Sequence, residues 1–108
     1  TGSNVRAIRC AADNTVVFNE WQHYVVTWDG STGYNNTGIH IYKNGTEVSY
    51  VTTNTAAIAG AASDAALDLI IGNRAAADRT FDGEIDEVRI YNRVLTAAEA
   101  AALYNQSR

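Results

Sequence analysis

The apolar and polar positions of this chain follow the two-residue period of short β-strands. Residues 23–28 are rich in β-branched and aromatic side chains and are followed by an Asp–Gly pair, a composition typical of a strand that ends in a turn. Because side chains alternate along a strand, Tyr24, Val26 and Trp28 share one face. We expect this face to lie in the core, with Trp28 as a core residue rather than a platform for a sugar.

The strongest turn signal lies between two further strands. Residues 39–43 and 46–53 flank the pair Asn44 and Gly45. A type I′ hairpin turn favours this pair because both of its central residues need a positive φ, so the sequence predicts a β-hairpin here. Three more short strands are predicted over residues 5–10, 15–18 and 67–71.

The C-terminal part of the chain predicts a last strand and then a helix. In residues 81–91 the apolar side chains change from odd to even positions, so one face cannot bury all of them and we expect a β-bulge near Asp86. Thr96 and Glu99 then form a capping box, in which each side chain accepts a hydrogen bond from the backbone amide of the other residue. A short Ala-rich helix is predicted to follow as far as about residue 104.

Length and charge restrict the class of protein. A chain of 108 residues forms one domain with a single core. Short strands without βαβ spacing predict an all-β, antiparallel β-sandwich with one short C-terminal helix. The net charge of −4 and the scattered Lys and Arg residues argue against a nucleic-acid partner, which requires a basic surface. The chain has no apolar run of membrane-spanning length, so we expect no membrane insertion.

Four motifs together resemble the second half of a laminin-G-like domain, a jelly roll of the concanavalin A-like lectin type. They are W-x-H-x-x-x-T-W-D-G at residues 21–30, I-x-I-Y-x-N-G at residues 39–45, I-G-N at residues 71–73 and the run at residues 81–104. Their order and spacing agree with the family over about residues 15–105. The resemblance implies a module of a secreted or cell-surface protein that recognises carbohydrate or glycoconjugate without catalysis.

The beginning of the chain departs from the family. Such domains carry several strands ahead of the segment that starts at Trp21, and here only about 20 residues precede it. The chain contains no Met, so Thr1 is not a translational start and we expect an excised or processed piece. Residues 1–108 are then one shortened domain, the C-terminal part of one, or a sandwich that a partner chain completes. Unpaired strand edges promote association, so the alternative function is self-assembly, with homodimerisation through exposed edges.

The last predicted strand carries an acidic cluster that raises the question of catalysis. Laminarinase-type glycoside hydrolases share the fold of the resemblance and carry E-x-D-x-x-E or E-x-D-x-E on one strand, because they need two carboxylates. Glu84 and Asp86 match the beginning of this motif, but Val88 and Arg89 stand where the second Glu would be. We therefore expect no catalytic residues, and a glycoside hydrolase fragment ranks third after recognition and assembly.

Four residues are candidates for binding. For Asp86 two interpretations stay open: a carboxylate that accepts hydrogen bonds from loop amides, or a Ca²⁺ ligand, which the resemblance implies and which would need further oxygen ligands. His40 and Tyr42 point away from the two Ile residues of their strand, so we expect them on an exposed sheet face. For these side chains two interpretations also stay open: ordinary surface exposure, which ranks first, or a face on which a saccharide stacks. Tyr34, in the polar loop before this strand, is the third candidate for ligand binding.

Overall fold

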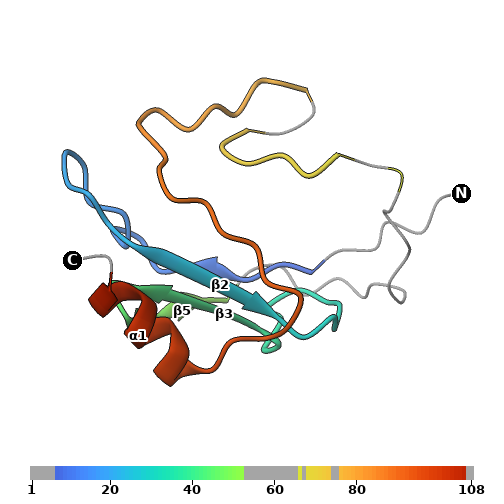
Figure 1. Ribbon diagram of the computed structural model, residues 1–108. Helices are drawn as coiled ribbons and strands as arrows, with labels where there is room; N and C mark the ends of the chain where they lie inside the picture. Colours follow the sequence, from blue (N-terminus) through green and yellow to red (C-terminus); the bar gives the residue numbers. More distant parts are fainter. Residues whose placement is uncertain (1–6, 53–65, 67, 74–75, 107–108) are drawn as a thin grey trace, which may run out of the picture. The chain divides into compact units, whose positions relative to one another are not determined.

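The computed structural model describes residues 7–52, 66, 68–73 and 76–106 of the chain. The strands and the helix of this part are β1 (Cys10–Ala11), β2 (Tyr24–Trp28), β3 (Ile39–Lys43), β4 (Thr46–Glu47), β5 (Tyr50–Val51) and α1 (Ala97–Gln106) (Figure 1). One antiparallel sheet has the order β2-β3-β4 and the other pairs β1 with β5. The predicted class, all-β with antiparallel sheets and one C-terminal helix, is confirmed.

The chain forms two compact units. Unit 1 comprises Thr1–Ala61 and Arg93–Arg108, and unit 2 comprises Ala62–Asn92. All the strands and the helix of the described residues belong to unit 1.

The turn between β3 and β4 has the predicted conformation. Asn44 has φ 48° and Gly45 has φ 80°, the two positive values that a type I′ turn requires. Asn44 also holds the start of β2, because its backbone N–H donates to His23 O at 2.8 Å while its Oδ1 accepts from His23 N at 2.9 Å. The turn therefore joins three strands, although it belongs to only two of them.

The helix begins with the predicted capping box. Thr96 N donates to Glu99 Oε1 at 3.1 Å, and Glu99 N donates to Thr96 Oγ1 at 3.2 Å. Arg93 adds a two-point ion pair to the same carboxylate, with Nη1 2.8 Å from Oε1 and Nη2 against Oε2. These hydrogen bonds, that of Arg93 first, lower the pKa of Glu99 from 4.5 to about 2.

No helix in the described part of the chain is long and apolar enough to cross a bilayer.

Helix α1 packs against β4 and the turn at Gly45, on the side of the sheet that carries His23 and that the sequence assigned to the exterior. The ring of Tyr104 lies 6.0 Å from that of His23, which shares its strand face with Thr27. Thr27 and Tyr42 are buried on this face, together with Leu95 and Ala100 from the helical segment. The expectation that Tyr42 is exposed is therefore wrong.

The opposite face of β2 was expected in the core and is exposed instead. Val26 is 64% exposed and Trp28 is 50% exposed. Alternation was predicted correctly, but the choice between the two faces depends on where the helix returns. Because half of the Trp28 side chain is exposed, the expectation that Trp28 is a core residue is wrong. Its Nε1 donates a hydrogen bond to Ser31 O at 2.6 Å.

Three predicted strands are absent from the described residues. They are residues 15–18, 67–71 and 81–91, of which residue 67 lies outside the described part. The described residues of these segments have no ladder partner within that part, and an extended segment becomes a strand only through such pairing. The predicted irregularity near Asp86 does occur as a backbone feature. Glu87 has φ 50°, and its N–H donates to Asp86 Oδ1 at 2.7 Å. Without a paired strand it is a kink and not a β-bulge.

In unit 2 the I-G-N motif is tied to the residues that follow it by one side-chain and one backbone hydrogen bond. Arg79 N donates to Asn73 Oδ1 at 3.1 Å, and Phe81 N donates to Gly72 O at 2.6 Å. Gly72 has φ 81°, and a Cβ there would lie 3.1 Å from Ile85 Cδ1. The glycine therefore permits both the turn and the approach of the Ile85 side chain.

Two glycines with similar positive φ angles allow a test of the contact between the hairpin and the helix. A Cβ on Gly45 would lie 3.2 Å from both Ala101 Cα and Tyr104 Cδ1, whereas a Cβ on Gly30, at φ 87°, would meet nothing within 4 Å. We expect Gly30→Ala to lower the free energy of unfolding by about 1 kcal/mol through its positive φ alone. Gly45→Ala should cost roughly 1–3 kcal/mol more because it crowds α1. Equal losses in urea unfolding would show that α1 does not pack on the turn.

The capping carboxylate makes the stability of unit 1 depend on pH. A folded-state pKa below the unfolded value means that Glu99 stabilises the fold fully above pH 4.5 and loses this effect as the pH falls to about 2. Glu99→Gln keeps a capping amide but removes the charge. We expect urea unfolding to separate the wild type from Glu99→Gln at neutral pH and the two curves to converge toward pH 2. A gap that stays constant with pH would contradict the Arg93–Glu99 ion pair.

Candidate functional site

A group of hydrogen-bonded polar side chains lies on β3, β4 and β5. His40 Nδ1 is 2.6 Å from Glu47 Oε1, and the Tyr50 hydroxyl donates to the same oxygen at 2.8 Å. The Tyr50 oxygen accepts in turn from Ile41 N at 2.8 Å. We call His40, Glu47, Tyr50 and the adjoining Arg9 the His40 cluster. Its members come from four segments that the two sheets bring together.

Arg9 closes the cluster from the segment before β1. Its guanidinium carbon lies 3.5 Å from the centroid of the Tyr50 ring, and Nη1 donates to Ile39 O at 2.6 Å. A guanidinium over an aromatic face is a favourable cation–π contact. On the other side, the rings of His40 and Tyr42 are stacked with centroids 6.4 Å apart. Arg9 and His40 therefore each contact an aromatic ring, Tyr50 or Tyr42, whose position is set by a strand.

The cluster keeps its carboxylate charged. Hydrogen bonds from His40 and then from Tyr50 lower the pKa of Glu47 below its usual value. Burial raises the pKa of Tyr50, which keeps its hydroxyl protonated as a donor at neutral pH. The His40 and Glu47 side chains are both partly open to solvent. The arrangement offers an ionised acceptor, an imidazole and a fixed phenol at one accessible position.

A loop of residues 29–38 adjoins this end of the sheet and is held by its own hydrogen bonds. Buried Asn36 donates from Nδ2 to Ser31 O at 2.6 Å, and its Oδ1 accepts from Ser31 Oγ and from Gly38 N, both at 2.8 Å. Hydrogen bonds from Ser31 lower the pKa of Asp29, with a smaller contribution from the charge of His40. The loop that carries Tyr34 is thus rigidly anchored beside the cluster.

The structure separates the three residues predicted to bind a ligand. His40 is accessible and belongs to the cluster. Tyr42 is 6% exposed, and its ring stacks against the His40 ring. Tyr34 is half-buried in the neighbouring loop. Their role in binding stays a prediction, but Tyr42 cannot serve as an exposed stacking platform because its side chain is buried.

Three members of the cluster were not predicted. The hairpin register pairs Tyr42 with Glu47, so the Asn–Gly turn alone places Glu47 diagonally across from His40. That signal was present in the sequence. Arg9 and Tyr50 join the cluster because β1 pairs with β5. This pairing involves only two residues on each strand, and no local sequence pattern predicts it.

Asp86 lies in unit 2 and is exposed. Its Oδ1 accepts from the amide of Glu87, as the structural interpretation expects. Nowhere in the described ranges do three or more His, Cys, Asp or Glu side chains gather as metal ligands. Calcium binding at Asp86 stays a prediction, and the contacts described here fit the hydrogen-bonding role.

The His40–Glu47 contact can be tested through the titration of the carboxyl group. The pKa of Glu47 is lowered from 4.5 by hydrogen bonds from His40 and Tyr50. We therefore expect the Glu47 carboxyl carbon, followed by NMR, to titrate below that value in the wild type and closer to it in His40→Ala and Tyr50→Phe. A titration midpoint that neither substitution moves would show that the cluster does not form.

The comparisons with known proteins agree with this architecture. The chain matches the laminin G-type family model described as the concanavalin A-like lectin/glucanases superfamily over residues 1–101. No curated protein and no solved structure matches it significantly. Domains of the laminin G type are usually non-enzymatic and often extracellular, although the superfamily includes glucanases. The antiparallel sheets and the C-terminal helix are consistent with a small β-sandwich of that superfamily. The chain belongs to the laminin G-type family of concanavalin A-like proteins.

Proposed function

We propose that the protein is a non-catalytic recognition module that binds carbohydrate or glycoconjugate through the His40 cluster. The observation that carries the proposal is the accessible His40–Glu47 pair, which is fixed by Tyr50 at 2.8 Å and rests on aromatic rings. Family membership supports a binding role of this general kind.

The chemistry of the cluster suits a saccharide. A sugar hydroxyl both donates and accepts, so it can donate to the Glu47 carboxylate while it accepts from a neighbouring donor. Hydrogen bonds to a charged acceptor contribute about 1.5–3 kcal/mol each. Because strands position both side chains, little conformational entropy is lost when a ligand binds.

The same features favour binding over hydrolysis. A glycosidase needs a carboxyl group with a raised pKa to protonate the leaving oxygen. The pKa of Glu47 is lowered by its two hydrogen bonds, which makes this group a poor proton donor at neutral pH. We place the module in a secreted or cell-surface protein, as is common for its family.

A second candidate function, self-assembly, rests on the exposed face of β2. Tyr24, Val26 and Trp28 are all exposed there, and β2 is an edge of its sheet among the described residues. An apolar edge strand is prone to pair with another chain. Light scattering of the purified protein distinguishes the two functions, since assembly requires a dimer or larger species and recognition does not.

The binding proposal predicts a specific effect of one carboxylate. We expect the wild type to bind members of an array of neutral and sialylated glycans, and Glu47→Gln to weaken the tightest of them about tenfold or more in calorimetry. Asp13→Asn is the matched control, because it removes the same charge from an exposed turn. The proposal fails if the array shows no binding, or if Glu47→Gln and Asp13→Asn bind equally well.

A further inference from the structure

Unit 1 has a second feature outside the His40 cluster, a loop with two exposed aromatic side chains. The segment of residues 17–22, which we call the aromatic loop, is closed by one side chain. Val17 N donates to Gln22 Oε1 at 3.0 Å, and Gln22 Nε2 donates back to Val17 O. Gln22 Nε2 also reaches Glu20 O at 3.1 Å. The side-chain amide of Gln22 thus makes hydrogen bonds with both backbone groups of Val17, as a paired strand would, and closes the six-residue loop.

The base of the loop is tied to the sheet. Thr15 O accepts from Lys43 Nζ at 2.6 Å and from the Tyr24 hydroxyl at 3.3 Å, and that hydroxyl also lies 3.1 Å from Gln22 Oε1. Asn19 has φ 62°, a conformation that Asn adopts at lower cost than most residues. The loop is therefore preorganised, and binding there would not require the segment to become ordered.

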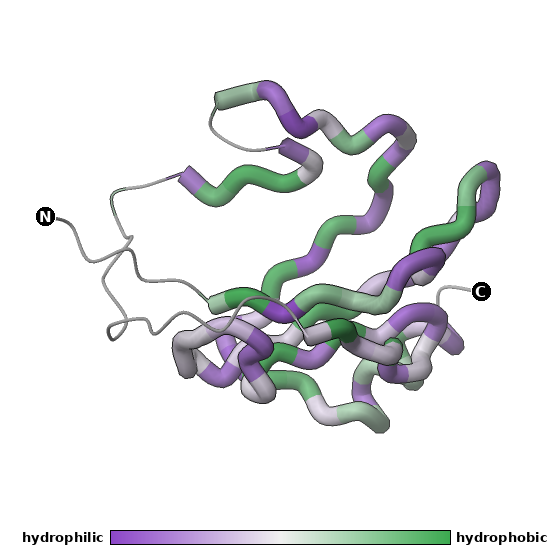
Figure 2. Tube along the Cα trace, turned by 180° about the vertical axis from the view of Figure 1, so that it is seen from behind, coloured by the Kyte–Doolittle hydropathy of each residue, from purple (hydrophilic) through white to green (hydrophobic). Residues whose placement is uncertain are grey.

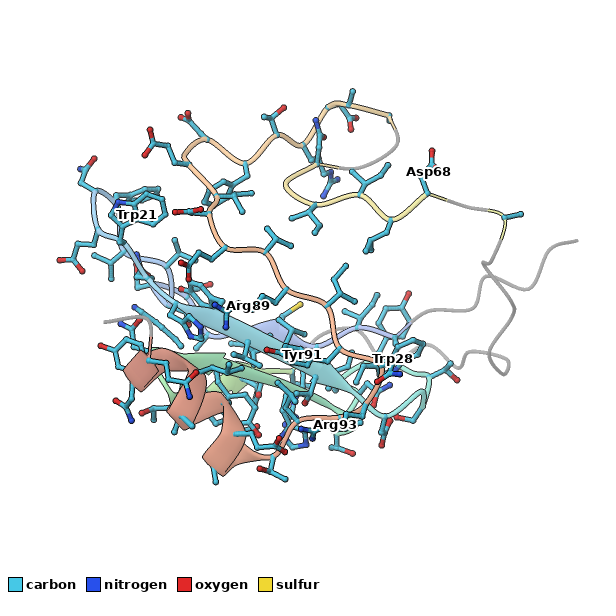
Figure 3. All side chains as sticks on the ribbon, in the orientation of Figure 1. Trp21, Trp28, Asp68, Arg89, Tyr91 and Arg93 are labelled. Carbon is cyan, nitrogen blue, oxygen red and sulfur yellow. The ribbon has the colours of Figure 1, made fainter. Side chains whose placement is uncertain are left out.

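The locked loop holds two large aromatic side chains in solvent. Phe18 is 85% exposed and Trp21 is 69% exposed. Figure 3 places Trp21 at the outer end of the loop and Trp28 at the opposite end of β2, and the loop extends beyond the strands in Figure 2. Single exposed apolar residues are common. Here two aromatic rings lie on one loop that side-chain hydrogen bonds hold in place, and the fold gains little burial from either ring.

Charge narrows the class of ligand. Asn19 and Glu20 lie between the two aromatic residues in the sequence and offer an amide and a carboxylate. The ammonium group of Lys43 donates to Thr15 O. The chain has a net charge of −4. Sulfated or uronic sugars would meet a carboxylate here, whereas neutral sugars would find acceptors for their hydroxyl groups beside an aromatic face.

We propose that the aromatic loop is a second saccharide contact, in which Trp21 and Phe18 stack on the C–H faces of neutral β-linked pyranose units. β-Linked glucose units, the simplest case, have equatorial hydroxyl groups and flat C–H faces, which fit the negative face of an aromatic ring. This inference rests on the proposed function and adds its ligand class. The loop precedes Tyr24, the first residue of β2, and His40 pairs with Thr27 three residues further along this strand. Tyr24 and Thr27 are about 10 Å apart along the strand, so the two contacts are separate.

The two tryptophans permit a direct test. Trp28→Phe leaves Trp21 as the only tryptophan, and Trp21→Phe leaves Trp28. Cellohexaose is titrated into both variants, with a heparin-derived hexasaccharide as the charged control. We expect cellohexaose to change the fluorescence of Trp28→Phe and to protect it from acrylamide quenching, with no change in Trp21→Phe. In calorimetry Trp21→Ala should bind cellohexaose about three- to tenfold more weakly than the wild type.

The remaining outcomes separate this inference from the proposed function. Binding of cellohexaose that depends on Glu47 and leaves the Trp21 signal unchanged overturns the inference and keeps the function. Binding that depends on Trp21 and not on Glu47 keeps the inference and removes the His40 cluster. If no cellohexaose binds, or the Trp21 signal follows protein concentration alone, the inference is wrong, and the glycan array still decides the function.

Discussion

The structure of unit 1 depends on the two-residue turn at Asn44 and Gly45. The positive φ angles of this pair set the register of β3 against β4. The Asn44 side chain and backbone fix His23, the residue before β2, through two hydrogen bonds. The missing side chain of Gly45 leaves the room that α1 occupies. Strand pairing, register and the position of the helix thus meet at one turn.

From this turn the two ends of the sheet acquire different properties. Toward Trp28 and Ile39, the register brings Glu47 to His40, and the short β1–β5 sheet adds Tyr50 and Arg9 to complete a polar cluster on aromatic rings. Toward Tyr24 and Lys43, side-chain hydrogen bonds lock a loop whose aromatic rings stay in solvent. Hydrogen bonds hold the side chains of both features in place, which lowers the conformational entropy that is lost when a ligand binds.

What the sequence predicts well is whatever a few neighbouring residues decide. The Asn–Gly turn and the Thr96–Glu99 capping box have the predicted hydrogen bonds because each needs only local geometry. The burial of Tyr42 and the exposure of Trp28 were mispredicted because they depend on which face α1 covers, a contact more than fifty residues away along the chain. Strand formation in residues 81–91 likewise depends on a partner that local alternation does not specify.

The central claim is that unit 1 recognises saccharide at the two ends of β2 and not across its exposed face. The most direct test is a map of backbone amide shifts in a heteronuclear NMR titration with cellohexaose. We expect the largest shifts at Phe18 and Trp21 and at His40 and Glu47, with small shifts at Val26. Shifts centred on Val26, or a uniform absence of shifts at both ends, would contradict the account.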